Sequence, residues 1–306
     1  MAYHSGVANS FSDLLSSLIS NCQLDGWSYD GGLSALYKAG GPHVSVYIDS
    51  SGLHARGLLG LTTVGQDLNP VRMGYLMGSG AYNVSFPCNY HQFVFQSEVY
   101  MVVNYDSDYC MFISFGKSAV TGLPGSGTWT CGTAGNGFAN QWSASKPISI
   151  ESVNSFGNAN KTTGAFCWST NSLGYVNANF RLDHGFYTVN KWNLTEETDE
   201  FFPMASNAQT ELYNCQPNAW NSEAVLLPCR AYAVRPSTRY SLVFDAINVR
   251  HVRVDNLDLG QIVTLGPDQW MTFPFFRKDT SQRDGLTSNQ GIDHTGTFGW
   301  AIKYEP

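Results

Sequence analysis

Charged residues are scarce in this chain of 306 residues: they make up 13% of it, about half the share of roughly 25% usual in soluble domains. The formal net charge is −7, and the basic residues form no dense patch. Because phosphate binding needs clustered lysine and arginine, we expect no nucleic-acid partner. There is also no apolar run close to the ~20 residues that a membrane-spanning helix needs. The N-terminus lacks the pattern of a secretory signal peptide, so we expect synthesis in the cytosol without membrane insertion.

Common signatures of catalysis are missing as well. The sequence contains no phosphate-binding GK[ST] loop, dinucleotide fingerprint, HExxH motif, GxSxG elbow or EF-hand loop. We therefore expect a protein without enzymatic activity, bound cofactor or metal. The chain has seven cysteines, an odd number, and no CxxC pair. This pattern favours buried, reduced thiols over a disulfide framework or a zinc site.

The residues that are abundant favour β-structure. Aromatic residues make up 14% of the chain, which also has 30 glycines, a balance typical of strands and tight turns. One helix is nevertheless predicted, beginning at Ser10 or Ser12 and ending at Gly26. Its apolar residues recur at helical spacing, so they share one face: Phe11, Leu14, Leu15, Leu18, Ile19 and Cys22.

After this helix the apolar period changes to two. Residues 44–48 and 53–61 flank a turn and predict a hairpin. Residues 91–96, 98–105 and 109–115 predict three strands whose short connections favour an antiparallel meander. The first predicted domain is therefore of the α+β class, with the helix packed on an antiparallel sheet over residues 1–120.

The remaining chain predicts a second domain that is rich in β-structure. Residues 121–145 are rich in glycine and poor in charge, which indicates a linker or loop. Many short strands follow in residues 146–306 and favour a sandwich-like or barrel-like fold. Residues 183–223 form a long irregular insertion, of the kind that often serves as an interaction element.

Several charged groups have a functional and a plainer interpretation. Asp106 and Asp108 suit a cation, but Asp in a short turn usually bonds its own backbone, and we favour the turn. The acidic residues at 196–200 have the chemistry for glycoside cleavage, yet a solvated loop is the stronger interpretation. His184 and His251 lack the context of a nucleophile, and so does His294, although a catalytic triad is not ruled out by sequence.

Two sets of residues are candidates for contacts with a partner. Aromatic side chains in the irregular insertion have the shape to stack on sugars or to anchor a protein: Trp192, Trp220 and Tyr213. Basic residues and residues 293–299 precede the last predicted strand and indicate a contact between subunits: Arg277, Lys278 and Arg283.

Both ends of the chain resemble a known family. Residues 249–304 contain VRHVRVDNLDLGQIVTLGPDQWMTFPFFRKDT and DHTGTFGWAIKY, and the N-terminal half contains FSDLLSSLISNCQLDGW and YHQFVFQSEVYMVVNYDSDYCMFISFGKS. These segments resemble virion structural proteins of tailed bacteriophages and prophages. The resemblance covers about half of the chain and leaves out residues 183–223.

This resemblance implies a non-enzymatic component of the virion tail or baseplate, assembled in the bacterial cytoplasm from several symmetric copies. Its partners would be other virion proteins and copies of itself, with a trimer or hexamer expected by analogy. It transfers no catalytic residues. Three alternatives stay open: a receptor-binding module that recognises a surface glycan or pilus through Trp192 and Trp220, a capsid decoration protein, and a glycan depolymerase that uses the acidic loop.

Overall fold

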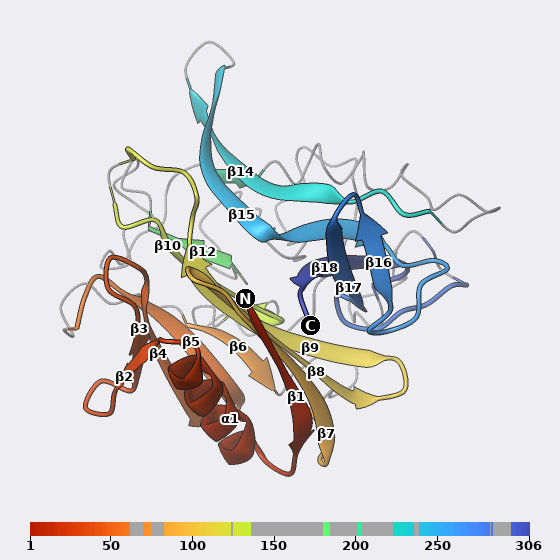
Figure 1. The fold of residues 1–306 in the computed structure, drawn as a ribbon, viewed down its shortest axis with the longest axis horizontal. Coiled ribbons are helices and arrows are strands. Elements are labelled where there is room, and N and C mark those ends of the chain that lie inside the picture. The colour runs from red at the N-terminus through yellow and green to blue at the C-terminus, as the bar shows by residue number, and fades with distance from the viewer. Residues whose placement is uncertain are drawn as a thin grey trace, which may run out of the picture.

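Three antiparallel sheets of six strands and one helix make up the part of the chain that the structure describes (Figure 1). In this computed structural model the described residues are 1–61, 70–74, 83–123, 125–135, 180–183, 201–203, 223–235, 239–281, 283 and 295–306. The mostly β class, with a helix on an antiparallel sheet near the N-terminus, confirms the coarse fold expected from the sequence.

The central sheet contains the predicted meander. Its strands are ordered β1-β7-β8-β9-β10-β12. Their bounds are β1 (Ala2–Ala8), β7 (Cys88–Val94), β8 (Glu98–Asp106), β9 (Tyr109–Lys117), β10 (Thr128–Gly132) and β12 (Phe180–Leu182).

Most strands of the other two sheets come before β7 or after β12 in the sequence. The N-terminal sheet is ordered β11-β6-β5-β4-β3-β2, with β2 (Ser28–Asp30), β3 (Ala35–Tyr37), β4 (His43–Asp49), β5 (Gly52–Leu58), β6 (Val71–Gly74) and β11 (Ala134–Gly135). The C-terminal sheet is ordered β13-β14-β15-β18-β17-β16, with β13 (Phe201–Pro203), β14 (Leu227–Arg235), β15 (Arg239–Arg253), β16 (Ile262–Leu265), β17 (Asp268–Pro274) and β18 (Phe298–Tyr304).

Both faces of the central sheet are buried. Along β8, Tyr100 and Val102 belong to a core shared with the C-terminal sheet, whereas Met101 and Val103 belong to a core shared with the N-terminal sheet. Alternate side chains of a strand point to opposite faces, so a strand buried on both sides becomes apolar throughout. This explains the unbroken apolar run of β8, and it makes the central sheet the middle layer of the molecule in Figure 1.

The helix α1 (Phe11–Leu24) contacts strands of the central and N-terminal sheets. Leu14, Leu18 and Cys22 are buried in the core that these two sheets share. Ser10 caps the helix, and its hydroxyl accepts a hydrogen bond from the Asp13 amide at 3.1 Å.

Replacing Ser10 with alanine is expected to lower the free energy of unfolding by about 1 kcal/mol, because the Asp13 amide loses its acceptor at the helix start. Chemical denaturation measures the effect. Ser17→Ala is the matched control, since Ser17 lies within the same helix and does not cap it. Equal losses in the two variants would contradict the capping role of Ser10.

Two sequence predictions differ from the structure. None of the three sheets closes in the described residues, so the barrel-like alternative is wrong for this part of the chain: the end strands of each sheet, such as β13 and β16, do not pair. Residues 128–132, in the predicted linker, form the buried strand β10. Gly132 is needed there because a Cβ would lie 2.9 Å from the Arg72 oxygen of β6. Residues 136–145 lie outside the described residues, and the domain boundary stays a prediction.

The two ends of the chain lie side by side (Figure 1). The Met1 amine is 3.7 Å from a carboxylate oxygen of Glu305. The Tyr3 and Tyr304 rings pack edge to face with centroids 5.1 Å apart. These contacts join β1 of the central sheet to the end of β18.

Candidate functional site

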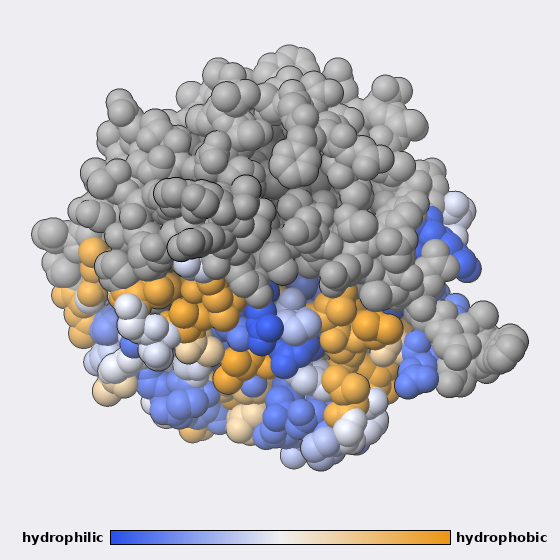
Figure 2. All heavy atoms as spheres, turned by 90° about the horizontal axis from the view of Figure 1, so that it is seen from above, coloured by the Kyte–Doolittle hydropathy of each residue, from blue (hydrophilic) through white to orange (hydrophobic). Residues whose placement is uncertain are grey.

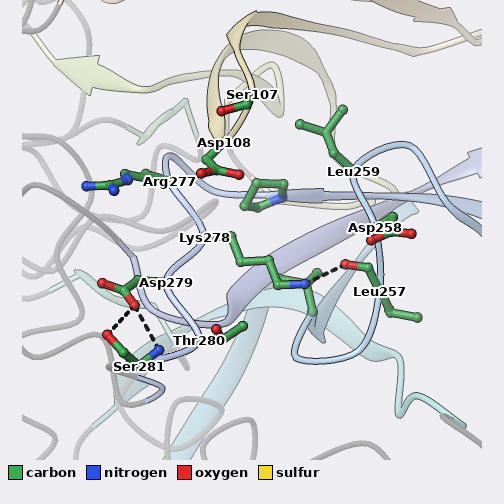
Figure 3. A pocket seen from close by; sticks show the side chains of 12 residues that line it. Ser107, Asp108, Leu257, Asp258, Leu259, Arg277, Lys278, Asp279, Thr280 and Ser281 are labelled. Atoms are coloured by element: carbon green, nitrogen blue, oxygen red, sulfur yellow. Dashed lines mark hydrogen bonds between the residues drawn. The ribbon is translucent and has the colours of Figure 1, made fainter.

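A polar groove lies beside the turn between β8 and β9, where the central and C-terminal sheets meet (Figure 3). Its volume is about 750 Å³. The turn supplies Ser107 and Asp108, the connection after β15 supplies Val254 and residues 257–259, and the end of β17 with the following segment supplies Pro274 and residues 277–281. Charged groups of both signs therefore line the groove together with apolar side chains.

Arg277 is placed in the groove by the β9 strand. The backbones of Tyr109 and Arg277 form an antiparallel bridge, and the Cys110 amide donates to the Phe276 oxygen at 2.7 Å. The Arg277 guanidinium then lies 5.2 Å from the centre of the Tyr109 ring, within the range of a cation–π contact. No ion pair of Arg277 with another described residue is found, and in Figure 3 its guanidinium points away from the Lys278 amine.

Lys278 is fixed by a backbone carbonyl. Its amine donates to the Leu257 oxygen at 2.8 Å, as Figure 3 shows. Burial lowers the pKa of this amine, and the opposing influence of Asp258, Asp255 and Asp108 does not cancel that effect. The side chain is thus a positioned donor at the groove base.

Arg283 lies apart from the groove lining. Its Nε is 3.7 Å from an Asp255 oxygen, and its side chain is 55% exposed. Asp255 mainly serves Arg253, which donates from Nε at 3.1 Å and from Nη2 at 3.2 Å. The structure therefore places Arg277 and Lys278 in the groove lining and Arg283 outside it, beside a buried ion pair.

The remaining candidates have different outcomes. Trp192, Trp220 and Tyr213 lie outside the described residues, as do His184, His294 and the acidic residues 196–200. Thr295 and Thr297, in the segment before β18 that was expected at an intersubunit contact, are fully buried. Asp106 accepts a hydrogen bond from the Ser107 amide at 2.7 Å, which confirms its role in the turn.

A group of Asp49, Ser51 and His54 in the β4–β5 hairpin was not anticipated from the sequence. Nε2 of His54 lies 2.9 Å from Asp49 and 3.1 Å from Ser51. A serine–histidine–aspartate relay uses the two ring nitrogens for different partners, and here one nitrogen contacts both. The group therefore ties the turn together and does not form a relay.

The described cysteines match the expected buried thiols. All five are buried thiols that form no disulfide: Cys22, Cys88, Cys110, Cys131 and Cys229. Burial raises the pKa of Cys88 to about 11 and raises the pKa of Cys22 and Cys110 further. These thiols are poor nucleophiles at neutral pH.

Metal-binding and membrane-spanning features were sought in the same residues. Within the described ranges, no group of three or more His, Cys, Asp or Glu side chains has the arrangement to hold a metal ion. The one described helix is too short and too polar to cross a membrane.

Apolar side chains also reach the surface. In Figure 2 the described part of one face shows hydrophobic groups separated by hydrophilic ones. The exposed large apolar residues include Val7, Leu24, Ile247, Ile262 and Leu265. They belong to several elements and form no single apolar cavity of the kind that encloses a small ligand.

Comparison with known proteins gives no relationship. No protein-family model matches the chain, and no curated protein matches it.

Proposed function

We propose that this protein is a non-enzymatic structural component of a tailed-bacteriophage virion, with a place in the tail or baseplate. The proposal starts from the resemblance of the N-terminal and C-terminal segments to that class. The observation that carries it is an open polar groove built from exactly those segments: the β8–β9 turn, the connection after β15 and the residues after β17. A groove lined by charges of both signs suits another protein surface better than a small substrate.

The proposed architecture is an α+β unit followed by a β-rich unit with sandwich-like packing. Aromatic side chains of the central sheet, such as Phe112 and Trp129, share a core with Phe244 and Trp300 of the C-terminal sheet. Such packing leaves the charged rim of the groove outside the core, where it is accessible to a neighbouring copy. Arg277 and Lys278 are the residues we assign to that contact, and the scarcity of charge elsewhere suits surfaces buried in an assembly.

The first experiment is the mass of the purified protein by light scattering together with its copy number in intact particles. A trimer or hexamer, present in a multiple of three or six, supports a place in the tail or baseplate. A monomer present in hundreds of copies would move the protein to the capsid surface and contradict the proposal. Absence from particles would contradict every virion role.

Arg277→Glu is expected to weaken self-association by roughly tenfold, because it reverses a groove charge that lacks an ion-pair partner among the described residues. Gln23→Glu is the control, since Gln23 is exposed on α1 and also becomes acidic. The oligomer dissociation constant is measured by sedimentation for both variants. Unchanged association of a folded Arg277→Glu protein would exclude the groove as the contact between copies.

A further inference from the structure

Strand β15 contains an irregular segment where the C-terminal sheet reaches the central sheet. On β14, Cys229 pairs with Ala246, whereas the preceding Pro228 pairs with Arg250. Residues 247–249 therefore bulge out and have no partner on β14. Pairing of β15 with β18 begins only at Val249, opposite Ile302. The amides of the bulge need acceptors from outside the sheet, because unpaired buried amides are costly.

Glu98, the first residue of β8, supplies these acceptors. Its carboxylate accepts from the Ile247 amide at 3.1 Å, the Asn248 amide at 3.2 Å and the Asn248 side-chain amide at 2.7 Å. The Tyr100 hydroxyl donates a fourth hydrogen bond at 2.9 Å. The Glu98 side chain is 0% exposed. A single buried carboxyl group thus accepts the hydrogen bonds that a neighbouring strand would otherwise accept, and it links the two sheets.

The opposite side of the bulge is held by a cation. Nη1 of Arg250 donates to the Ile247 oxygen at 3.0 Å and to the Val249 oxygen at 2.8 Å. Nearby, the Asp245 amide donates to the Ser118 hydroxyl at 3.1 Å, and the Ala119 amide donates to the Asp245 oxygen at 3.0 Å. Residues 245–248 are therefore fixed to Glu98 and to the segment that follows β9. The Ile247 and Val249 carbonyls are held from within β15 by Arg250.

The neighbouring strand leaves room for the Glu98 side chain. Glu98 pairs with Gly116 of β9. A Cβ at Gly116 would lie 3.0 Å from the Glu98 Cγ and 2.6 Å from the Ser97 oxygen. Only glycine fits this position without a shift of the backbone, so the buried site of Glu98 is built from both strands.

No charged group offsets a negative charge on Glu98 among the described residues. Tyr100 is the titratable group that faces it from β8. On β9, the Lys117 amine is directed away to the Gly40 oxygen at 2.8 Å. On β15, Asp245 pairs with Arg230 at 3.2 Å, and Arg250 is engaged by the carbonyls of the bulge. Burial consequently raises the pKa of Glu98 to about 7, and the four donors lower it only in part.

We infer that Glu98 is a proton-dependent latch between the central and C-terminal sheets. When the carboxyl group is protonated, its O–H donates to the Tyr100 hydroxyl across the same 2.9 Å contact, and the joint at residues 245–249 stays closed. When it is ionised, an uncompensated charge is held away from water, and opening of the bulge relieves it by hydration.

The direction of the pH effect follows from the two pKa values. In the open joint the carboxyl group titrates near its ordinary value of 4.5, and in the closed joint near 7. The stabilisation of the closed joint relative to the open joint is therefore greatest below pH 4.5, declines as the pH rises to about 7, and is constant above that. The difference corresponds to an increase of about 300-fold in the opening equilibrium across this window.

Hydrogen exchange of the Ile247 and Asn248 amides tests this inference. Rates between pH 4.5 and 8 are divided by the rates of an unstructured peptide, which removes the intrinsic pH dependence of exchange. We expect protection of both amides to fall by up to about 300-fold in the natural protein and to stay constant in Glu98→Gln. The Cys110 amide, which donates to Phe276 outside this joint, serves as the control and should show no such step.

Equal pH dependence in the natural protein and in folded Glu98→Gln would overturn the latch. Should Glu98→Gln fail to fold, carboxyl-carbon NMR of the natural protein decides the question. A Glu98 titration midpoint near 7 supports the inference, and a midpoint near 4.5 overturns it. This inference does not depend on the proposed virion role.

Discussion

Replacing Asp255 with alanine is expected to lower the free energy of unfolding by about 3–5 kcal/mol, the usual loss when one member of a buried ion pair is removed. Arg253 is 1% exposed, and Asp255 binds both its Nε and its Nη2. The guanidinium also lies 4.4 Å from the centre of the Phe298 ring and donates to the Thr297 hydroxyl. Without the carboxylate, the buried guanidinium would lose the partner that accepts from two of its nitrogens. Thermal and chemical denaturation measure the loss.

Two further variants separate the buried charge from simple loss of a side chain. Asp268→Ala removes a partner of Lys303 in a pair whose side chains are 26% and 41% exposed, and it should cost less than about 1 kcal/mol. Arg253→Met combined with Asp255→Ala leaves no buried charge and should be more stable than Asp255→Ala alone. A double variant as unstable as the single one would show that the unpaired guanidinium is not the cause.

Trp300→Ala is expected to lower the free energy of unfolding by about 3–5 kcal/mol, because it leaves a large cavity in the core between two sheets. Trp300 of β18 is 0% exposed. Its ring centroid lies 4.4 Å from that of Phe112 in β9 and 6.1 Å from that of Tyr100 in β8. The indole thus joins the C-terminal sheet to the central sheet, and denaturation of the variant measures this contribution.

Two control variants differ from Trp300→Ala, one in the size of the new side chain and one in its position. Trp300→Phe retains a ring in the same core and should lose less stability than Trp300→Ala. Leu24→Ala should change the free energy of unfolding by less than about 0.5 kcal/mol, because Leu24 is 76% exposed. Calorimetry of the natural protein should show one transition, since both sheets share this core. Two separate transitions, with only the second affected by Trp300→Ala, would contradict the shared core.

Local patterns in the sequence were sufficient for the elements near the N-terminus. The helix, the hairpin of β4 and β5, and the meander of β7, β8 and β9 are confirmed. Each depends on spacing and turn residues within a few positions of one another, as in the Ser10 cap. The spacing of apolar residues and the turn residues that predict these elements lie within the elements themselves.

The arrangement of the sheets could not be predicted in the same way. Strand β10 lies in a glycine-rich stretch because Gly132 permits close approach to β6, a contact far away in sequence. The alternation of apolar residues predicts two short strands at residues 240–244 and 249–254, whereas the structure has one strand, β15, with a bulge that Glu98 holds. Neither fact has a local signal in residues 128–132 or 245–248.

The candidate site shows the same division. The sequence predicts a contact role for the basic residues Arg277 and Lys278, but for Asp108, which also lines the groove, it favours a turn over a cation site. Their proximity follows from the bridge between Tyr109 and Arg277, which joins positions 168 residues apart. Glu98 carried no signal at all, because burial of a carboxyl group is a property of the packed sheets.

The proximity of β1 and β18 determines where a linker or a fused domain can be attached to this protein. With the Met1 amine 3.7 Å from Glu305, the two ends leave the molecule at one point, so a short connection would span them and allow a circularly permuted chain. Domains fused to either end would occupy the same side of the molecule. In a ring of identical copies, every such attachment would project at the same radius.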